Sequence, residues 1–544
     1  MLRGAKACNH RALHRANPSS AIEKLWIACL LTACGASAAL AQSAPANLSA
    51  PATPAGAGPW PQATTLPLLS PPSVMPLATV QPPRATPPSM LPARPAAPDT
   101  SNYVPLNQLP PGQQPFGPTP MPGPCFDGCD EEEFSIEARY KYNFGGGYLS
   151  VFTPDEEFSL NLQNEVTLDG TFFDRPDMPT AEKGFNIPFL RTYLFGNVTE
   201  NWQYQIATQS FLGQFNILDA FINWRFDDRL NIRAGRGLSP FLYEYYAFSP
   251  AWEPVINNSV LFQLAGKRQE GVMAWGNVRD KTIQYQAGIF NGISGAFYDL
   301  DRAVDFLGSL FWTPFADTES GLASLGIGGS VQTGDHHYAL NQTGSAWTNG
   351  AGEPTTNINY ITSSGIPFFQ YNTNTQADGN QTKFAPCLFW FGRFSVLTEY
   401  LHCTRRLSSG PVSGDTAQSG FYINTSYFLT GERYTGNGLA GYTTISPLNP
   451  YRPGRGQCGP GAWEVACQIS QLSLSNSNFA FTNTPNNYAS RCDQLMLGLN
   501  WWPNKYTRLS LDNVWTWFDR AIPLGPNPAV GQFNTVWCRV AMFF

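Results

Sequence analysis

After Gly147, apolar and polar side chains alternate along repeated segments of about ten residues, the length of a strand that crosses a membrane. In the segment 506–518, Leu509, Leu511, Trp515 and Trp517 alternate with Arg508, Ser510, Asp512 and Thr516. In the segment 214–226, the same pattern places Leu218, Ala220, Ile222, Trp224 and Phe226 on one face, opposite Asp219, Asn223 and Arg225. A period of two predicts β-strands whose two faces meet different surroundings.

The composition indicates what the apolar faces contact. Only 13% of the residues are charged and 14% are aromatic, whereas roughly 25% of the residues of soluble proteins are charged. Alternation alone would also suit a soluble sandwich. No apolar run of the length of a membrane helix follows the N-terminus, and the sequence therefore favours a transmembrane antiparallel β-barrel. The formal net charge of −6 argues against nucleic acid as a partner.

Turn residues divide the chain into sixteen strand-like segments. We expect these strands at 158–169, 187–198, 201–212, 214–226, 229–236, 266–278, 281–291, 303–314, 321–333, 381–391, 394–405, 417–429, 461–471, 492–503, 506–518 and 533–544. Tight turns are expected at 199–201, 227–229, 278–280, 391–393 and 503–505, and long loops near 170–186, 237–265, 292–302, 334–381, 405–417, 471–491 and 519–532. Short turns on one side and long loops on the other are typical of outer-membrane barrels, whose short turns face the periplasm.

The chain ends as a strand that would close the barrel. Its lipid-facing residues would be Val536, Cys538, Val540, Met542 and Phe544, and this register directs Arg539 into the lumen. Pairing of this last strand with the first removes the free edges of the sheet. A terminal Phe544 also resembles the signal by which outer-membrane barrels are recognised for assembly.

The N-terminal 147 residues are not expected to belong to the barrel. Residues 1–41 combine a basic lead, an apolar core and Ala39-Leu40-Ala41, as in a cleaved export signal, although Leu31–Cys34 also fits a lipoprotein box. Residues 42–124 form a Pro/Ala-rich segment that predicts a disordered linker. An acidic segment with the close cysteines Cys125 and Cys129 occupies 125–147, and these cysteines could form a disulfide. The barrel would span 148–544.

No pattern of catalytic residues is visible, and we expect no enzyme activity, cofactor or metal. The pair His336-His337 falls in an expected long loop, where solvated side chains are favoured over metal ligands.

Several stretches resemble the phosphate-selective porin O and P family of outer-membrane channels. They are "SGFYINTSYFLTGERY" (419–434), "GAWEVACQISQLSL" (461–474), "LMLGLNWWPNKYTRLSLDNVW" (495–515), "TPDEEFSLNLQNEVTLDGTFFD" (153–174) and "RAGRGLSPF" (233–241). The resemblance covers roughly 148–544 and implies a sixteen-stranded barrel, typically a homotrimer, through which small hydrophilic solutes or anions diffuse. It places the constriction loop after 233–241.

A sixteen-stranded lumen needs an inward loop to narrow it, and we expect that loop at 237–265. It contains no Lys or Arg, so phosphate specificity is not expected. Its aromatic residues should pack against the wall, with Glu244 or Glu253 near the opening. The expected constriction residues are Glu244, Tyr245, Tyr246, Trp252 and Glu253, and the expected pore-lining residues are Arg191, Arg225, Arg233, Arg236, Lys267, Arg268, Arg393, Glu399 and Arg539.

These features predict an outer-membrane porin, embedded in membrane lipids, with a weak anion preference left open. Two alternatives remain at this point. The barrel could anchor a structural tether formed by the Pro-rich arm, or it could be an enzyme that depends on His336 or His337.

Overall fold

A computed structural model describes residues 136–143, 146–175, 178, 183–211, 214–247, 252–279, 282–293, 299, 301–340, 359–436, 438–524 and 529–544. The expected export signal, the Pro/Ala-rich linker, Cys125, Cys129 and the acidic cluster lie outside the described residues. No helix among the described residues is long and apolar enough to cross a membrane.

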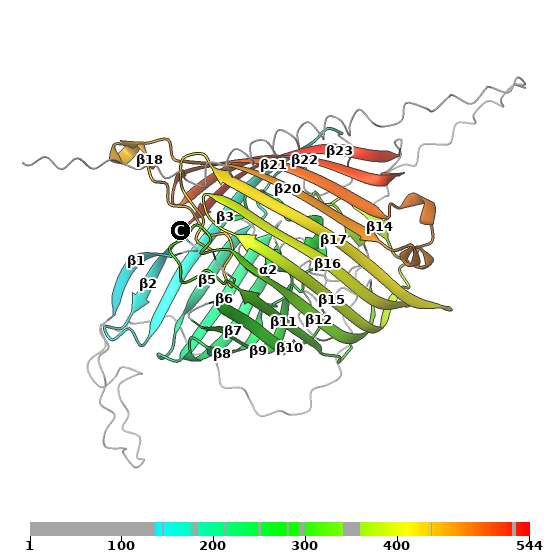
Figure 1. Ribbon diagram of the computed structural model, residues 1–544, viewed down its shortest axis with the longest axis horizontal. Coiled ribbons are helices and arrows are strands. Elements are labelled where there is room, and N and C mark those ends of the chain that lie inside the picture. Colours follow the sequence, from blue (N-terminus) through cyan, green and yellow to red (C-terminus); the bar gives the residue numbers. More distant parts are fainter. Residues whose placement is uncertain are drawn as a thin grey trace, which may run out of the picture. The chain divides into compact units, whose positions relative to one another are not determined.

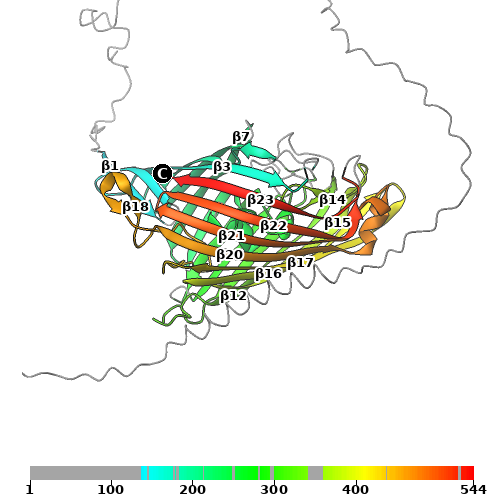
Figure 2. The same cartoon turned by 90° about the horizontal axis from the view of Figure 1, so that it is seen from above.

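Within the described residues, sixteen antiparallel strands form a closed barrel (Figures 1 and 2). They are β3 (Ser159–Phe173), β5 (Leu190–Asn197), β6 (Trp202–Phe211), β7 (Gln214–Asp227), β8 (Leu230–Leu238), β9 (Arg268–Val278), β10 (Ile283–Phe290), β11 (Asp305–Trp312), β12 (Gly326–Ala339), β15 (Gln376–Trp390), β16 (Phe394–Ser409), β17 (Val412–Phe428), β20 (Ala462–Leu474), β21 (Arg491–Asn504), β22 (Thr507–Ile522) and β23 (Val530–Phe543). Each expected strand overlaps one of these, and the predicted fold class is confirmed.

The first and last strands of the wall meet at a seam. β23 pairs antiparallel with β3 from Thr535 opposite Phe173 to Phe543 opposite Glu165. The hairpin of β1 (Glu137–Asn143) and β2 (Gly146–Phe152) continues the sheet beyond the end of β23, because β2 pairs with the start of β3. The short strand β4 (Gly184–Asn186) pairs with the other end of β3. Closure leaves no unpaired edge among the wall strands, as a lipid environment requires.

The alternating residues have the expected orientations, with one exception. Val536, Val540 and Met542 of β23, and Phe544 directly after it, are 38–46% exposed on the outer face. Leu218 is instead 3% exposed and buried with Asp219, because a β-bulge inserts it between the pairs Ala207–Asp219 and Thr208–Ile217. An extra residue reverses the alternation locally, and the placement of Leu218 on the outer face was therefore wrong.

Two connections differ from expectation. The predicted loop 405–417 is absent, because β16 and β17 extend to a two-residue turn at 410–411, with Arg406 and Asp415 3.7 Å apart across the strands. Conversely, β17 and β20 are joined on the short-turn side by the long connection 429–461. It contains β18 (Tyr451–Arg452), the 3-10 turn η5 (Pro453–Arg455) and β19 (Gln457–Cys458).

Further short elements lie in the long connections. They are α2 (Tyr243–Tyr246), η4 (Val260–Leu264), β13 (Asn359–Ile361), β14 (Pro367–Gln370), η6 (Asn476–Phe481) and η7 (Pro485–Asn487). Many of their side chains are buried together with inward side chains of the wall, so the main apolar cluster of the described residues lies inside the barrel.

Candidate functional site

The connection 239–267 between β8 and β9 folds into the barrel and is held first by Glu399 of β16. The backbone N–H groups of Tyr243 and Glu244 donate to Glu399 Oε1 at 2.8 Å and to Oε2 at 3.1 Å. The hydroxyl of Tyr422 donates to Glu399 Oε2 at 2.8 Å. Glu399 is 1% exposed. We call this contact the first anchor; it lies at the start of α2, where backbone N–H groups lack partners within the helix.

A second anchor fixes the middle of the same loop to β21, β22 and β23. Asn500 Nδ2 donates to the carbonyl of Pro254 at 2.6 Å, and Arg539 Nη1 donates to that of Ile256 at 3.2 Å. The Ile256 N–H donates to the carboxylate of Asp512. Val255 and Ile256 also pack in a small apolar cluster with Ala466, Met496, Val514 and Trp537. The loop therefore contacts distant sectors of the wall and crosses the lumen between them.

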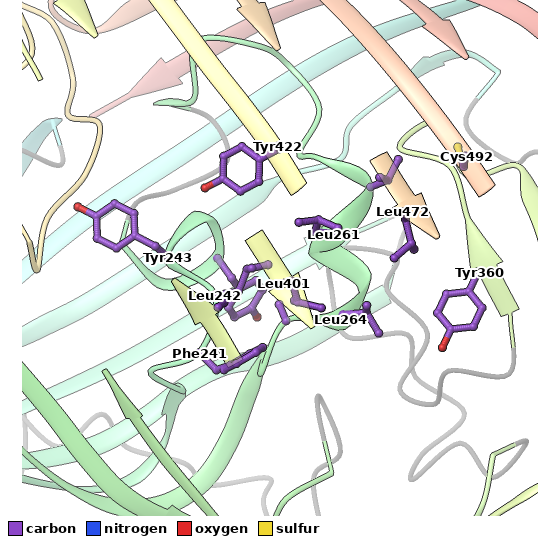
Figure 3. Close-up of a cluster of buried hydrophobic side chains, with 14 of the residues drawn as sticks. Phe241, Leu242, Tyr243, Leu261, Leu264, Tyr360, Leu401, Tyr422, Leu472 and Cys492 are labelled. Atoms are coloured by element: carbon purple, nitrogen blue, oxygen red, sulfur yellow. The ribbon is translucent and has the colours of Figure 1, made fainter. Parts of the chain in front are cut away.

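The loop then returns along the wall to β9. The side-chain amide of Gln263 bonds to both the N–H and the carbonyl of Ile361, at 2.9 Å each. Lys383 Nζ donates to the carbonyl of Leu264 at 3.2 Å. Figure 3 shows Leu261 and Leu264 beside Leu401 and Leu472 of the wall. The returning half is thus bound by both apolar contacts and backbone hydrogen bonds.

The two loop carboxylates do not lie at an opening. Glu244 is 2% exposed and accepts hydrogen bonds from the N–H and hydroxyl of Ser259. Glu253 is 1% exposed. Burial raises the pKa of Glu244 to about 8, although the Ser259 bonds lower it. The expected place of Glu244 or Glu253 near the opening was therefore wrong: the loop folds around its own carboxylates.

The aromatic side chains of the loop pack on its surroundings. Tyr243 stacks on Phe389 of β15, with ring centroids 5.3 Å apart. Tyr245 lies 5.1 Å from Phe262 and accepts a hydrogen bond from Arg268 at 3.3 Å. Trp252 lies 5.9 Å from Phe543. Tyr246 is 9% exposed and contacts the Tyr243 ring edge-on at 5.9 Å. Tyr243 and Tyr246 therefore lie beside β11 and β15, whereas Trp252 lies beside β23.

Three ion pairs of inward side chains lie on β3, β5, β7, β9 and β23. Arg539 is bidentate to Asp169, with both distances 2.7 Å. Arg268 contacts Asp219 at 2.8 Å, and Arg191 contacts Glu165 at 3.7 Å. We call these six residues the charged wall. Its three arginines were all predicted as pore-lining, and their acidic partners were not.

The other predicted pore-lining residues are dispersed. Arg233 donates to the carbonyl of Leu238 and lies over the Phe221 ring. Arg236 pairs with Glu270 at 2.7 Å, and Lys267 is 1% exposed. Two residues lie at short turns: Arg225 is paired with Asp228, and Arg393 donates to the carbonyl of Phe428.

Three buried cations were missed as site residues. Lys383, Arg405 and Arg508 are each at most 4% exposed on inward faces. Arg405 donates to the Tyr360 hydroxyl at 3.0 Å, and Arg508 to the carbonyl of Glu253. The alternation could have indicated their inward orientation, because exposed Phe384 and Leu511 lie on the opposite faces of β15 and β22.

The connection 429–461 adds a second obstruction from the short-turn side. Tyr434 and Tyr442 are each 1% exposed, with ring centroids 4.8 Å apart. The Gly441 N–H donates to the carbonyl of Ala247 in the first loop at 3.0 Å. A Cβ on Gly438 would lie 2.7 Å from the Cβ of Phe311 on β11, so the connection lies closely against the wall.

The histidine pair belongs to β12 and not to a loop. His336 is 1% exposed and lies between Asp301 at 3.4 Å and Asp305 at 3.2 Å, whereas His337 is exposed. The expectation that both are solvated loop residues was wrong for His336. Among the described residues, no group of three or more His, Cys, Asp or Glu side chains could hold a metal ion.

Comparisons with known proteins identify one matching protein family and several similar solved structures. The family model described as phosphate-selective porin O and P matches residues 160–520. No curated protein sequence gives a significant match. Similar solved structures include the outer membrane channel DcaP of Acinetobacter baumannii, at 11% identity and a TM-score of 0.44, covering 71% of this chain and 98% of that one. An anion-selective porin from Comamonas acidovorans has 11% identity and a TM-score of 0.40, covering 71% and 100%.

Proposed function

Because this chain belongs to the phosphate-selective porin O and P family, we propose that its solutes pass beside the charged wall. The protein is an outer-membrane barrel through which small hydrophilic solutes diffuse passively. The difference in exposure between two sectors of the lumen supports the route. Inward residues of β16, β20 and β22, such as Glu399, Glu464 and Arg508, are at most 2% exposed. In and beside the charged wall, Arg268 is 12% exposed and Tyr193 and Gln205 are partly exposed, whereas the other five residues of the charged wall are at most 5% exposed.

The balance of charge along this route favours a weak anion preference. Each arginine of the charged wall has a carboxylate partner, so these pairs contribute little net field to a passing ion. Arg233 donates to a carbonyl oxygen instead, which adds one cation to the same sector. Arg393 lies at a short turn and would act at the mouth, whereas the charge of Arg225 is offset by Asp228.

Reversal potential across a KCl gradient, measured on single channels of the purified protein, tests both parts of this proposal. Asp219→Asn leaves Arg268 without its partner and should shift the reversal potential toward anions. Arg233→Gln should shift it toward cations. Unchanged potentials in both variants would remove the charged wall from the route, and a protein that inserts without conducting would contradict the channel itself.

We also propose that the protein is a homotrimer, as the family resemblance implies. Native mass spectrometry of the detergent-solubilised protein should give three times the monomer mass, and a monomer at all protein concentrations would contradict the trimer.

A further inference from the structure

A cluster of cations and aromatic rings lies at the short-turn end of the barrel, outside the lumen. Arg452 and Lys505 both lie over the ring of Tyr506, at 5.3 Å and 5.2 Å from its centroid. Tyr140 of β1 contacts the same ring at 6.2 Å. Arg455 follows in the exposed hairpin of β18 and β19. Figure 2 shows β18 at the same end of the barrel as β1 and the C-terminus.

Rings at the ends of β20 and β21 continue this cluster along the outer face. Trp463 and Trp501 stack at 5.7 Å, and Tyr451 lies 5.9 Å from Trp501. Both indole N–H groups donate to the carbonyl of Pro460, at 3.1 Å and 2.8 Å. Tryptophan and tyrosine rings at the ends of barrel strands mark the boundary between hydrocarbon and headgroups. The cations therefore lie at headgroup level.

The rim at the short-turn end of β20 and β21 carries mainly positive charge, whereas the rim of β3 to β8 carries both acidic and basic residues. Residues 429–463 and 501–507 contain one acidic residue, Glu432. Glu432 is 5% exposed and accepts from the N–H of Leu448 at 2.9 Å. The rim of β3 to β8 carries the exposed acidic residues Asp155, Glu156, Glu157, Glu200 and Asp228, and Asp227 is partly exposed.

Apolar side chains are also exposed beside the cations. Leu448 is 66% exposed and Tyr451 is 42% exposed. In water this exposure would be unfavourable, whereas acyl chains next to a headgroup would cover both side chains.

We propose that Arg452, Arg455 and Lys505, with the rings of Tyr451, Trp463, Trp501 and Tyr506, form a binding site for an anionic phospholipid of the periplasmic leaflet. The phosphate contacts the cations and the acyl chains cover Leu448 and the outer face of β20 and β21. This inference rests on the outer-membrane location, with the short turns facing the periplasm. Charge complementarity and the adjoining aromatic belt identify the occupant.

Native mass spectrometry of the purified full-length protein in mild detergent, titrated with phosphatidylglycerol or phosphatidylcholine, tests the site. The protein should retain phosphatidylglycerol preferentially, and Arg452→Gln with Lys505→Gln should weaken that retention about thirtyfold, since each cation near the membrane surface contributes about 1 kcal/mol to the attraction of anionic lipid. The control, Arg229→Gln with Arg279→Gln, removes the same charge from the short turns that follow β7 and β9, away from the proposed site, and should retain the lipid.

The proposal would be overturned if both double variants lost phosphatidylglycerol retention equally. It would also be overturned if the unaltered protein showed no preference for phosphatidylglycerol over phosphatidylcholine. Millimolar inorganic phosphate should not displace the lipid; if it does, the site binds soluble anions. Benzoylphenylalanine, a photoreactive residue, placed at position 448 of the otherwise unchanged chain should crosslink to phosphatidylglycerol. Crosslinking to a second copy of the protein instead would show that this surface binds protein and would overturn the proposal. Conductance of Arg452→Gln with Lys505→Gln should equal that of the unaltered protein, which separates this test from that of the channel.

Discussion

Two buried carboxylates of the wall, Glu399 and Asp512, accept hydrogen bonds from the backbone of the constricting loop. Glu399 accepts from two consecutive N–H groups, and Asp512 accepts from Ile256. A buried N–H that loses its acceptor costs about 1–3 kcal/mol. These side chains therefore position the loop 239–267, and their effect on a passing ion is secondary.

Removal of the first anchor should loosen the loop. In Glu399→Ala, two buried N–H groups lose their acceptor, and we expect larger and noisier single-channel currents. The control Tyr422→Phe removes a hydroxyl that donates to Glu399 but leaves both loop contacts. Currents that are identical in Glu399→Ala and the unaltered protein would show that other contacts suffice to hold the loop.

The pKa of Glu244 predicts a pH dependence. Burial raises this pKa from its ordinary 4.5 to about 8, so between these values the folded protein holds a proton that the unfolded chain has lost. The contribution of this site to stability then falls as the pH rises through that window. Open-channel noise should increase between pH 5 and pH 9, with buried Glu253 adding to the effect.

Glu244→Gln keeps a neutral acceptor for Ser259 and should reduce this pH dependence, whereas Glu200→Gln at an exposed turn should not. Because Glu244 is largely protonated at neutral pH, its replacement should leave the reversal potential there unchanged. A shift toward anions in Glu244→Gln at pH 7 would contradict the buried, protonated state.

At the scale of the element, the alternation of apolar and polar residues predicts the strands, but it does not predict how the connections between them fold. The strands β21, β22 and β23 have the predicted faces throughout. The connection 429–461 contains no alternating segment and is rich in glycine, so nothing local indicates that Tyr434 and Tyr442 fold into the lumen.

The connection 429–461 should limit conductance from the periplasmic side. The N–H of Leu448 bonds to Glu432 at 2.9 Å, so a short Gly-Ser linker could replace residues 434–446 without moving the ends of the segment. We expect the conductance to rise. Thr435→Ala, a change at an exposed position on the same connection, is the control, and an unchanged conductance in the linker variant would mean that the route bypasses this segment.

At the scale of the whole molecule, closure of the barrel depends on the seam between β23 and β3. The backbone of Phe544 still pairs with Asn164, its N–H donating to the Asn164 carbonyl at 3.0 Å, and its ring is 45% exposed on the outer face. The last residue therefore belongs to the sheet and presents an aromatic side chain to lipid.

Deletion of Phe544 should lower the fraction of protein that inserts into the outer membrane, because the seam loses a backbone pair and the chain loses its terminal ring. The control Phe544→Tyr keeps the backbone pair and an aromatic ring at this position, and it should insert normally. The fraction of heat-modifiable protein in membrane extracts measures insertion, and normal insertion of the deletion variant would remove Phe544 from the assembly signal.

The sequence by itself determined the strands, their faces and the closed barrel, because alternation along a strand depends only on residues that are neighbours in the sequence. It also identified Arg191, Arg268 and Arg539, which lie on inward faces. Only the tertiary structure decided which carboxylate each arginine meets and that Glu244 is buried. It also decided which segments fill the lumen. These contacts join residues up to 370 positions apart, as in the pair Arg539–Asp169, and such distances are set by the closure of the sheet and not by neighbouring residues.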